Sequence, residues 1–331
     1  MRKRKKIIIG IHGIGNKPPK MLLELWWKKA ICEGLQRIGH PRRFFNFELV
    51  YWSHFLHSDP LSLSVKDKNN PLYLKHPYAP ANSNRANRTP SLLKKRWLGL
   101  VEKVLDALFL TENKIYNFDR ISDLIIRKKF RDLDLYYHKK NVDSTAAGLH
   151  AKTAIRQELA KVLKKHKRKR ILLIAHSMGS IIAYDVLTQV VPEVKIETFL
   201  TIGSPLGLPA IMKKIFREQQ IDFKEEKKVP TPENIRKSWV NFSDLDDGIT
   251  MNYDLCDDFK ENSHHVGPVD VLVNNDYEHH GVKNPHKSYG YLRTPEVAAV
   301  IHEFLREERP SPVEILKQRW AGLVHRVRNP L

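Results

Sequence analysis

The stretch that most constrains the fold is residues 171–180, Ile-Leu-Leu-Ile-Ala-His-Ser-Met-Gly-Ser. Its four leading apolar residues are typical of a central strand that is covered on both faces. Residues 180–187 then change to helical spacing, and small residues stand two positions before and two positions after Ser177. A strand, a tight turn with a serine at its tip and a helix are the context of a nucleophile elbow. Ser177 is therefore the candidate nucleophile, although an ordinary strand-to-helix turn has a similar pattern.

The rest of the chain alternates between strand patterns and helix patterns. Strands are predicted at residues 7–11, 44–52, 196–202, 238–242 and 269–273, and helices at residues 22–35, 147–163 and 297–308. Such alternation predicts an α/β fold with a mostly parallel central sheet and helices on both faces. We expect a single domain over residues 1–308, followed by a basic tail over residues 309–331.

An insertion is predicted at about residues 53–145, because periodicity disappears after residue 57 into polar residues and prolines. Within it, residues 92–110 predict an amphipathic helix. That helix is interpreted as a lid over an acyl pocket, as a membrane-contacting element or as a helix packed on the core. The charged residues 213–232 are expected at the surface.

The net charge of the chain is +20, and its densest basic runs are Arg2–Lys6 and Lys164–Arg170. Each run precedes a predicted strand, so parallel strands would place both at the sheet edge opposite the catalytic loops. A solvated rim, docking on an anionic membrane and nucleic-acid binding are the three interpretations. Nucleic acid is the least favoured, because no known nucleic-acid-binding motif accompanies the charge.

Localisation follows from three absences in the sequence. No apolar run approaches the ~20 residues that span a bilayer, and the apolar run after the basic N-terminus is too short for a signal peptide. Cys32 and Cys256 lack metal-ligand spacing and do not indicate a disulfide framework. We expect a cytoplasmic protein that contacts membranes at most peripherally.

Candidate partners for Ser177 follow two later strands. An acidic cluster with Asp244, Asp246 and Asp247 comes after residue 242, and a polar loop with His279, His280 and His286 comes after residue 273. Serine, acid and histidine in this order match a triad in which histidine activates the hydroxyl. The alternative, a divalent metal held by these acids with His264, His265, His279 and His280, lacks helical ligand spacing.

Five motifs carry a family resemblance. They are His12–Asn16 (His-Gly-Ile-Gly-Asn), Ala175–Gly179 (Ala-His-Ser-Met-Gly), Gly203–Gly207 (Gly-Ser-Pro-Leu-Gly), Asn241–Asp247 and Asn284–Tyr289. With them the chain resembles α/β-hydrolases, specifically lipase-like bacterial serine hydrolases. Ala175 departs from the glycine that is usual in the elbow.

The resemblance implies a role for each matching position. It makes Ser177 the nucleophile, Asp247 the acid and His286 the base, with Asp244 as the second candidate for the acid because Gly248 replaces an expected proline. It makes the backbone N–H groups of Ile14 and Met178 the oxyanion hole.

The expected function is hydrolysis of a carboxylic ester, with a lipid-type ester favoured over another small-molecule ester. No cofactor and no metal are expected. The alternative is a catalytically idle scaffold that binds an anionic membrane or nucleic acid. Fold and triad together do not exclude a peptidase or an acyltransferase.

Overall fold

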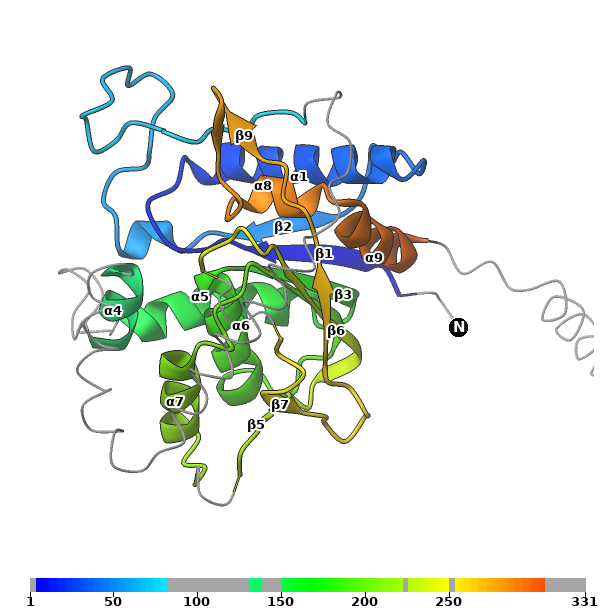
Figure 1. The fold of residues 1–331 in the computed structure, drawn as a ribbon. Coiled ribbons are helices and arrows are strands. Elements are labelled where there is room, and N and C mark those ends of the chain that lie inside the picture. Colours follow the sequence, from blue (N-terminus) through cyan, green and yellow to red (C-terminus); the bar gives the residue numbers. More distant parts are fainter. Residues whose placement is uncertain (1–3, 82–130, 139–150, 223–225, 250–253, 307–331) are drawn as a thin grey trace, which may run out of the picture.

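The computed structural model describes residues 4–81, 131–138, 151–222, 226–249 and 254–306. At its centre is a parallel sheet of six strands in the order β2-β1-β3-β4-β6-β8 (Figure 1). The strands are β1 (Lys6–Ile11), β2 (Phe47–Val50), β3 (Arg170–His176), β4 (Ile196–Ile202), β6 (Ile235–Ser243) and β8 (Pro268–Leu272). All five strand pairings are parallel, as the alternating pattern predicts.

Strand residues alternate between two hydrophobic cores, one on each face of the sheet. In β1, Ile7 and Ile9 pack into one core and Ile8 into the other. In β3, Leu173 joins the first core and Leu172 the second. Side chains of a strand point to opposite faces in turn, so an all-apolar strand needs cover on both sides.

Helices provide this cover. The first face carries α4 (Arg131–His138), α5 (Ala151–His166), α6 (Met178–Gln189) and α7 (Pro209–Glu218). The second face carries α1 (Lys20–Arg37), α8 (Ser288–Leu292) and α9 (Pro295–Leu305) (Figure 1). The side chain of Thr294 accepts a hydrogen bond from the N–H of Val297, which caps α9 at its N-terminus. The predicted fold class, α/β with helices on both faces, is confirmed.

Short elements complete the described part of the chain. They are η1 (Ser53–Phe55), β5 (Val229–Pro230), β7 (Phe259–Lys260), β9 (Glu278–His279) and β10 (Val282–Lys283). β5 pairs with β7 in parallel, and β9 forms an antiparallel hairpin with β10.

Two expectations are corrected by the structure. The strand predicted at residues 44–52 is only β2, and Phe44 before it is 88% exposed. The surface assignment of residues 213–232 is wrong near both ends, because Ile215 and Phe216 of α7 and Val229 of β5 are buried in the first core. The apolar residues of α7 recur at helical spacing, and the surrounding lysines and arginine mask this pattern in the sequence.

The described residues of the two basic runs lie where parallel strands require. Lys6 pairs in register with Arg170 at the amino ends of β1 and β3, and the loops that follow the strands lie at the other edge. Acidic residues partly neutralise this rim, because Lys165 forms an ion pair with Glu48 and Arg170 with Glu197.

Part of the predicted insertion packs on the core. Tyr136 of α4 donates a hydrogen bond of 2.6 Å to Asp185 of α6. The predicted helix at residues 92–110 and the tail at residues 309–331 lie outside the described residues. Within the described ranges, every helix is too short or too polar to cross a bilayer.

Candidate active site

Ser177 occupies a strained turn between β3 and α6. Its φ of 53° and ψ of −129° are rare for a residue with a side chain, and such strain costs about 1–3 kcal/mol. The turn is also crowded, because a Cβ atom at Gly179 would lie 2.8 Å from the carbonyl oxygens of Ile11 and His12. The glycine in the elbow thus lets α6 begin directly against the end of β1.

The structure brings Ser177, His286 and Asp247 together from three separate segments. Ser177 Oγ lies 2.9 Å from His286 Nε2, and His286 Nδ1 lies 2.8 Å from Asp247 Oδ2. Ser177 and Asp247 are buried, whereas the His286 side chain is 23% exposed. An imidazole that donates from Nδ1 to a carboxylate presents an unprotonated Nε2 to the hydroxyl, which is the arrangement of a serine activated by a general base.

Further hydrogen bonds hold the Asp247 carboxylate in place. Tyr291 Oη donates to Asp247 Oδ2 over 2.8 Å, and the backbone N–H of Ile249 donates to Oδ1 over 2.9 Å. Gly203, with φ of +56°, leaves space beside the pair, since a Cβ atom there would lie 3.1 Å from Asp247 Oδ2 and 3.3 Å from His286 Nδ1. The Gly-Ser-Pro-Leu-Gly motif thus begins where the acid meets the histidine.

Asp244 makes different contacts. Its side chain accepts hydrogen bonds from the backbone N–H groups of Asp246 and Asn275, and burial raises its pKa. This carboxylate ties the loop after β6 to the segment after β8. The other candidate histidines, His279 and His280, contact each other in the β9–β10 hairpin, with ring centroids 4.0 Å apart.

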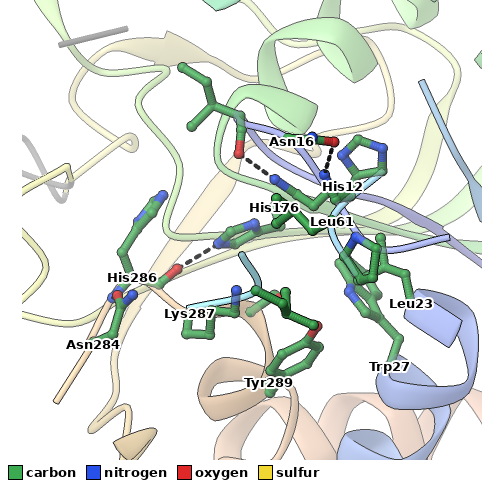
Figure 2. Close-up of a pocket in the computed structure, with 15 residues that line it drawn as sticks. His12, Asn16, Leu23, Trp27, Leu61, His176, Asn284, His286, Lys287 and Tyr289 are labelled. Carbon is green, nitrogen blue, oxygen red and sulfur yellow. Dashed lines mark hydrogen bonds between the residues drawn. The ribbon is translucent and has the colours of Figure 1, made fainter. Parts of the chain in front are cut away.

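Two side chains that the sequence did not indicate hold the backbone around His286. The Asn275 amide donates to the carbonyls of Pro285 and Lys287 over 2.7 and 2.9 Å. Its side chain fits only because residue 290 is glycine, where a Cβ atom would lie 1.6 Å from Asn275 Oδ1. His176 Nε2 donates to the carbonyl of His286 over 2.8 Å, a contact drawn as a dashed line in Figure 2.

The predicted oxyanion donors lie on either side of Ser177. Met178 is the first residue of α6. The backbone N–H groups of the first helical turn have no partner within the helix and lie at the positive end of its dipole. Ile14 follows Gly13, at which a Cβ atom would lie 2.6 Å from Ser177 Cβ, so this loop lies directly against the elbow. Lys17 Nζ donates to the carbonyls of Ile14 and Gly15 and holds the loop in place.

His12 supports the same loop from behind. Its Nδ1 donates to the Gly13 carbonyl over 2.9 Å, and its Nε2 accepts from the backbone N–H of Trp52 over 3.1 Å. The ring stacks on the Trp52 indole with centroids 4.7 Å apart. Burial lowers the pKa of His12, so this ring is neutral and has both nitrogens engaged.

A cavity of about 170 Å³ opens beside His286 and Ile14 (Figure 2). Its lining combines apolar side chains with polar and basic ones: His12, Ile14, Asn16, Lys17, Pro18, Leu23, Trp27, Leu61, Leu74, His176, Asn284, His286, Lys287, Ser288 and Tyr289. Within the described ranges, no group of three or more His, Cys, Asp or Glu side chains is arranged to hold a metal ion.

Sequence similarity supports the same fold. A family described as the PGAP1-like alpha/beta domain, an α/β-hydrolase-like family, matches residues 127–288, which include Ser177, Asp247 and His286. No similar sequence is found among curated proteins. With the six-stranded parallel sheet, the family match shows that the chain has an α/β-hydrolase fold.

Proposed function

We propose that this protein is a serine hydrolase of carboxylic esters, with Ser177 as nucleophile, His286 as general base and Asp247 as the acid that orients it. The observation that carries the proposal is the continuous chain of contacts from Ser177 Oγ through both ring nitrogens of His286 to Asp247. The strained elbow adds support, because strain of this kind persists where a reactive side chain has to be presented.

The reaction proceeds through an acyl-enzyme. Ser177 Oγ attacks the ester carbonyl while His286 Nε2 takes the hydroxyl proton, and the N–H groups of Ile14 and Met178 stabilise the resulting oxyanion. The tetrahedral intermediate collapses, the C–O bond of the ester breaks and His286 gives its proton to the departing alcohol. Water then attacks the acyl-enzyme with His286 again as base, which releases the acid and restores Ser177.

An idle scaffold is the competing function. An idle protein has no need to keep the whole contact chain, and Tyr291 and Asn275 would not have to support Asp247 and the His286 loop. The basic rim at the amino ends of β1 and β3 supports only peripheral contact with an anionic membrane, because Glu48 and Glu197 offset part of its charge.

A p-nitrophenyl ester series from short to long acyl chains, together with fluorophosphonate labelling, tests the proposal. We expect the wild type to turn over these esters and to label, and Ser177→Ala to lose at least about 10⁴-fold in kcat and all labelling. Ser58→Ala, which removes an exposed hydroxyl bonded to Asp59, should behave as the wild type. A protein that neither labels nor turns over esters, yet binds anionic liposomes in low salt, would favour the scaffold.

A further inference from the structure

Two lysines line the cavity beside His286, and they come from two different segments of the chain. Lys17 belongs to the loop after β1, and Lys287 directly follows the proposed base. Figure 2 labels Lys287, Trp27 and His176 among the side chains that line this cavity. A cavity next to a nucleophile is where part of a substrate has to lie, so the charge of its lining bears on what that substrate is.

Lys287 has no acidic partner among the described residues. Its ammonium lies 5.3 Å from the centre of the Tyr289 ring, and no carboxylate of the described segments pairs with it. Burial lowers the pKa of Lys287 to about 8. Positive charge held in a partly buried site without a counter-ion is costly, and a ligand with negative charge would offset that cost.

Lys17 adds a second cation to the same wall. Two of its N–H donors go to the carbonyls of Ile14 and Gly15. Burial and the charge of Lys287 lower its pKa to about 7, and Asp132 acts against this shift. The Asp132 carboxylate is already engaged, because one oxygen accepts from the backbone N–H of Gly15 and contacts the His57 ring.

Trp27 adds its indole ring to the same lining. Its side chain lines the cavity and is fully buried. Its Nε1–H has no hydrogen-bond partner among the described residues and is closed off from solvent, so it does not donate into the cavity. An anionic oxygen in the cavity would interact with the two ammonium groups beside this ring.

The size of the cavity suits a small polar group. Its volume of about 170 Å³ corresponds to a few water molecules, each of which takes about 30 Å³ in the liquid. That is below the ~300 Å³ at which ligand pockets usually begin. A phosphate or a carboxylate fits there, whereas a long acyl chain has to lie elsewhere.

We propose that the cavity walled by Lys17, Lys287 and Trp27 binds an anionic group, a phosphate or a carboxylate, of the ester that Ser177 cleaves. This assignment rests on the proposed ester hydrolysis for its placement, since the cavity borders Ile14 and His286. It narrows the substrate class to esters with a negative charge close to the scissile bond.

Binding is measured first, without turnover. Full-length Ser177→Ala protein is titrated calorimetrically with inorganic phosphate, glycerol phosphate and glutarate, and with glycerol as the neutral comparison. We expect at least one anion to bind and glycerol not to bind. Adding Lys287→Met should weaken the binding of that anion about 10- to 100-fold, the usual range for a hydrogen bond to a charged group, and Lys287→Arg should restore part of it. Lys283→Met, an exposed lysine four residues earlier, is the matched control and should bind as the parent does.

Turnover then identifies which half of the ester carries the charge. A preference for p-nitrophenyl hemiglutarate over p-nitrophenyl pentanoate places the anion in the acyl half. A preference for lysophosphatidate over monoacylglycerol places it in the alcohol half. In either case Lys287→Met should lower the ratio of anionic to neutral kcat/KM at least about tenfold, and Lys283→Met should not.

The two proposals fail in different ways. Turnover of neutral esters, with no anion bound and no anionic preference, would overturn the anion site and leave the hydrolase standing. Anion binding that depends on Lys287 in a wild-type protein that neither labels nor turns over esters would overturn the hydrolase. If Lys287→Met does not fold, as judged by circular dichroism, Lys287→Gln replaces it, and unchanged anion affinity in that variant would overturn the site.

Discussion

The two sides of His286 differ in how completely the chain satisfies its own polar groups. On the side of Asp247, the carboxylate, the imidazole and the serine are joined in one series, and Tyr291 adds another donor. On the cavity side, the Lys287 ammonium lacks a hydrogen-bond acceptor among the described residues. The first side is complete without a ligand, and the second has an ammonium group available for one. The two proposals thus assign chemistry and recognition to different walls of one site.

The largest effect expected comes from the complete side. Asp247→Asn keeps the shape of the acid but allows the wrong imidazole tautomer, so kcat should fall by about 10⁴-fold. Asp244→Asn should instead lower stability, since Asp244 holds backbone N–H groups and does not contact His286. Ester kinetics with thermal unfolding of both variants checks this. A larger loss of kcat in Asp244→Asn than in Asp247→Asn would mean that Asp244 orients His286 and that Asp247 serves stability.

Asn275→Ala tests whether the complete side depends on the backbone that carries His286. The variant removes both hydrogen bonds to the Pro285 and Lys287 carbonyls, and misplacement of a base by about 1 Å can cost about 10²-fold. We expect kcat to fall by that order and the anion affinity, measured in a Ser177→Ala background, to fall by a smaller factor, because Asn275 also holds the Lys287 backbone. Calorimetry and kinetics on the same protein separate the two readouts. Equal losses of kcat and of anion affinity would mean that the Asp247 side and the cavity side of His286 are not independent.

The pH dependence of anion binding probes the cavity side. Lys17 and Lys287, with pKa values near 7 and 8, are mostly protonated at pH 6 and mostly neutral at pH 9. The titratable groups around them are Asp132, His12, His76, His176 and His286. Burial lowers the pKa values of His12, His76 and His176, so these three rings carry no charge over this range. Glutarate affinity in Ser177→Ala should fall at least about tenfold from pH 6 to pH 9. An affinity that stays flat over this range would argue against the lysines.

The smallest effect expected is that of Tyr291→Phe. The hydrogen bond that the hydroxyl donates to Asp247 is lost, together with the one that it accepts from the backbone N–H of Asp244. At about 1 kcal/mol, the loss at Asp247 lowers kcat about fivefold with little change in KM. Tyr184→Phe is the matched control, because the buried hydroxyl of Tyr184 makes hydrogen bonds with Pro230 and Gln219, away from the site. It should cost similar stability in thermal unfolding and leave kcat unchanged. Equal kcat losses in both variants would mean that Tyr291 acts only through stability.

Much of the frame follows from local patterns. The apolar run before Ser177, the small residues of the turn and the helical spacing after it predict the strand, the turn and the helix that the structure contains. Thr294 and Pro295 likewise predict the start of α9. These signals act between neighbours in the chain, so they can be recognised without the fold. The surface prediction fails for Ile215 and Phe216 because the charged residues of α7 mask its buried face.

The sequence by itself determined most of the sheet strands, their parallel direction and a serine at a strand end. The resemblance selected Asp247 and His286 from three acids and three histidines, but only the tertiary structure brings them to that serine, since segments 39 to 109 residues apart have to converge. Tyr291, Asn275 and His176 have no local pattern that marks them as supports. The same holds for Lys17, Lys287 and Trp27, because a cavity is made by surfaces that only packing brings together.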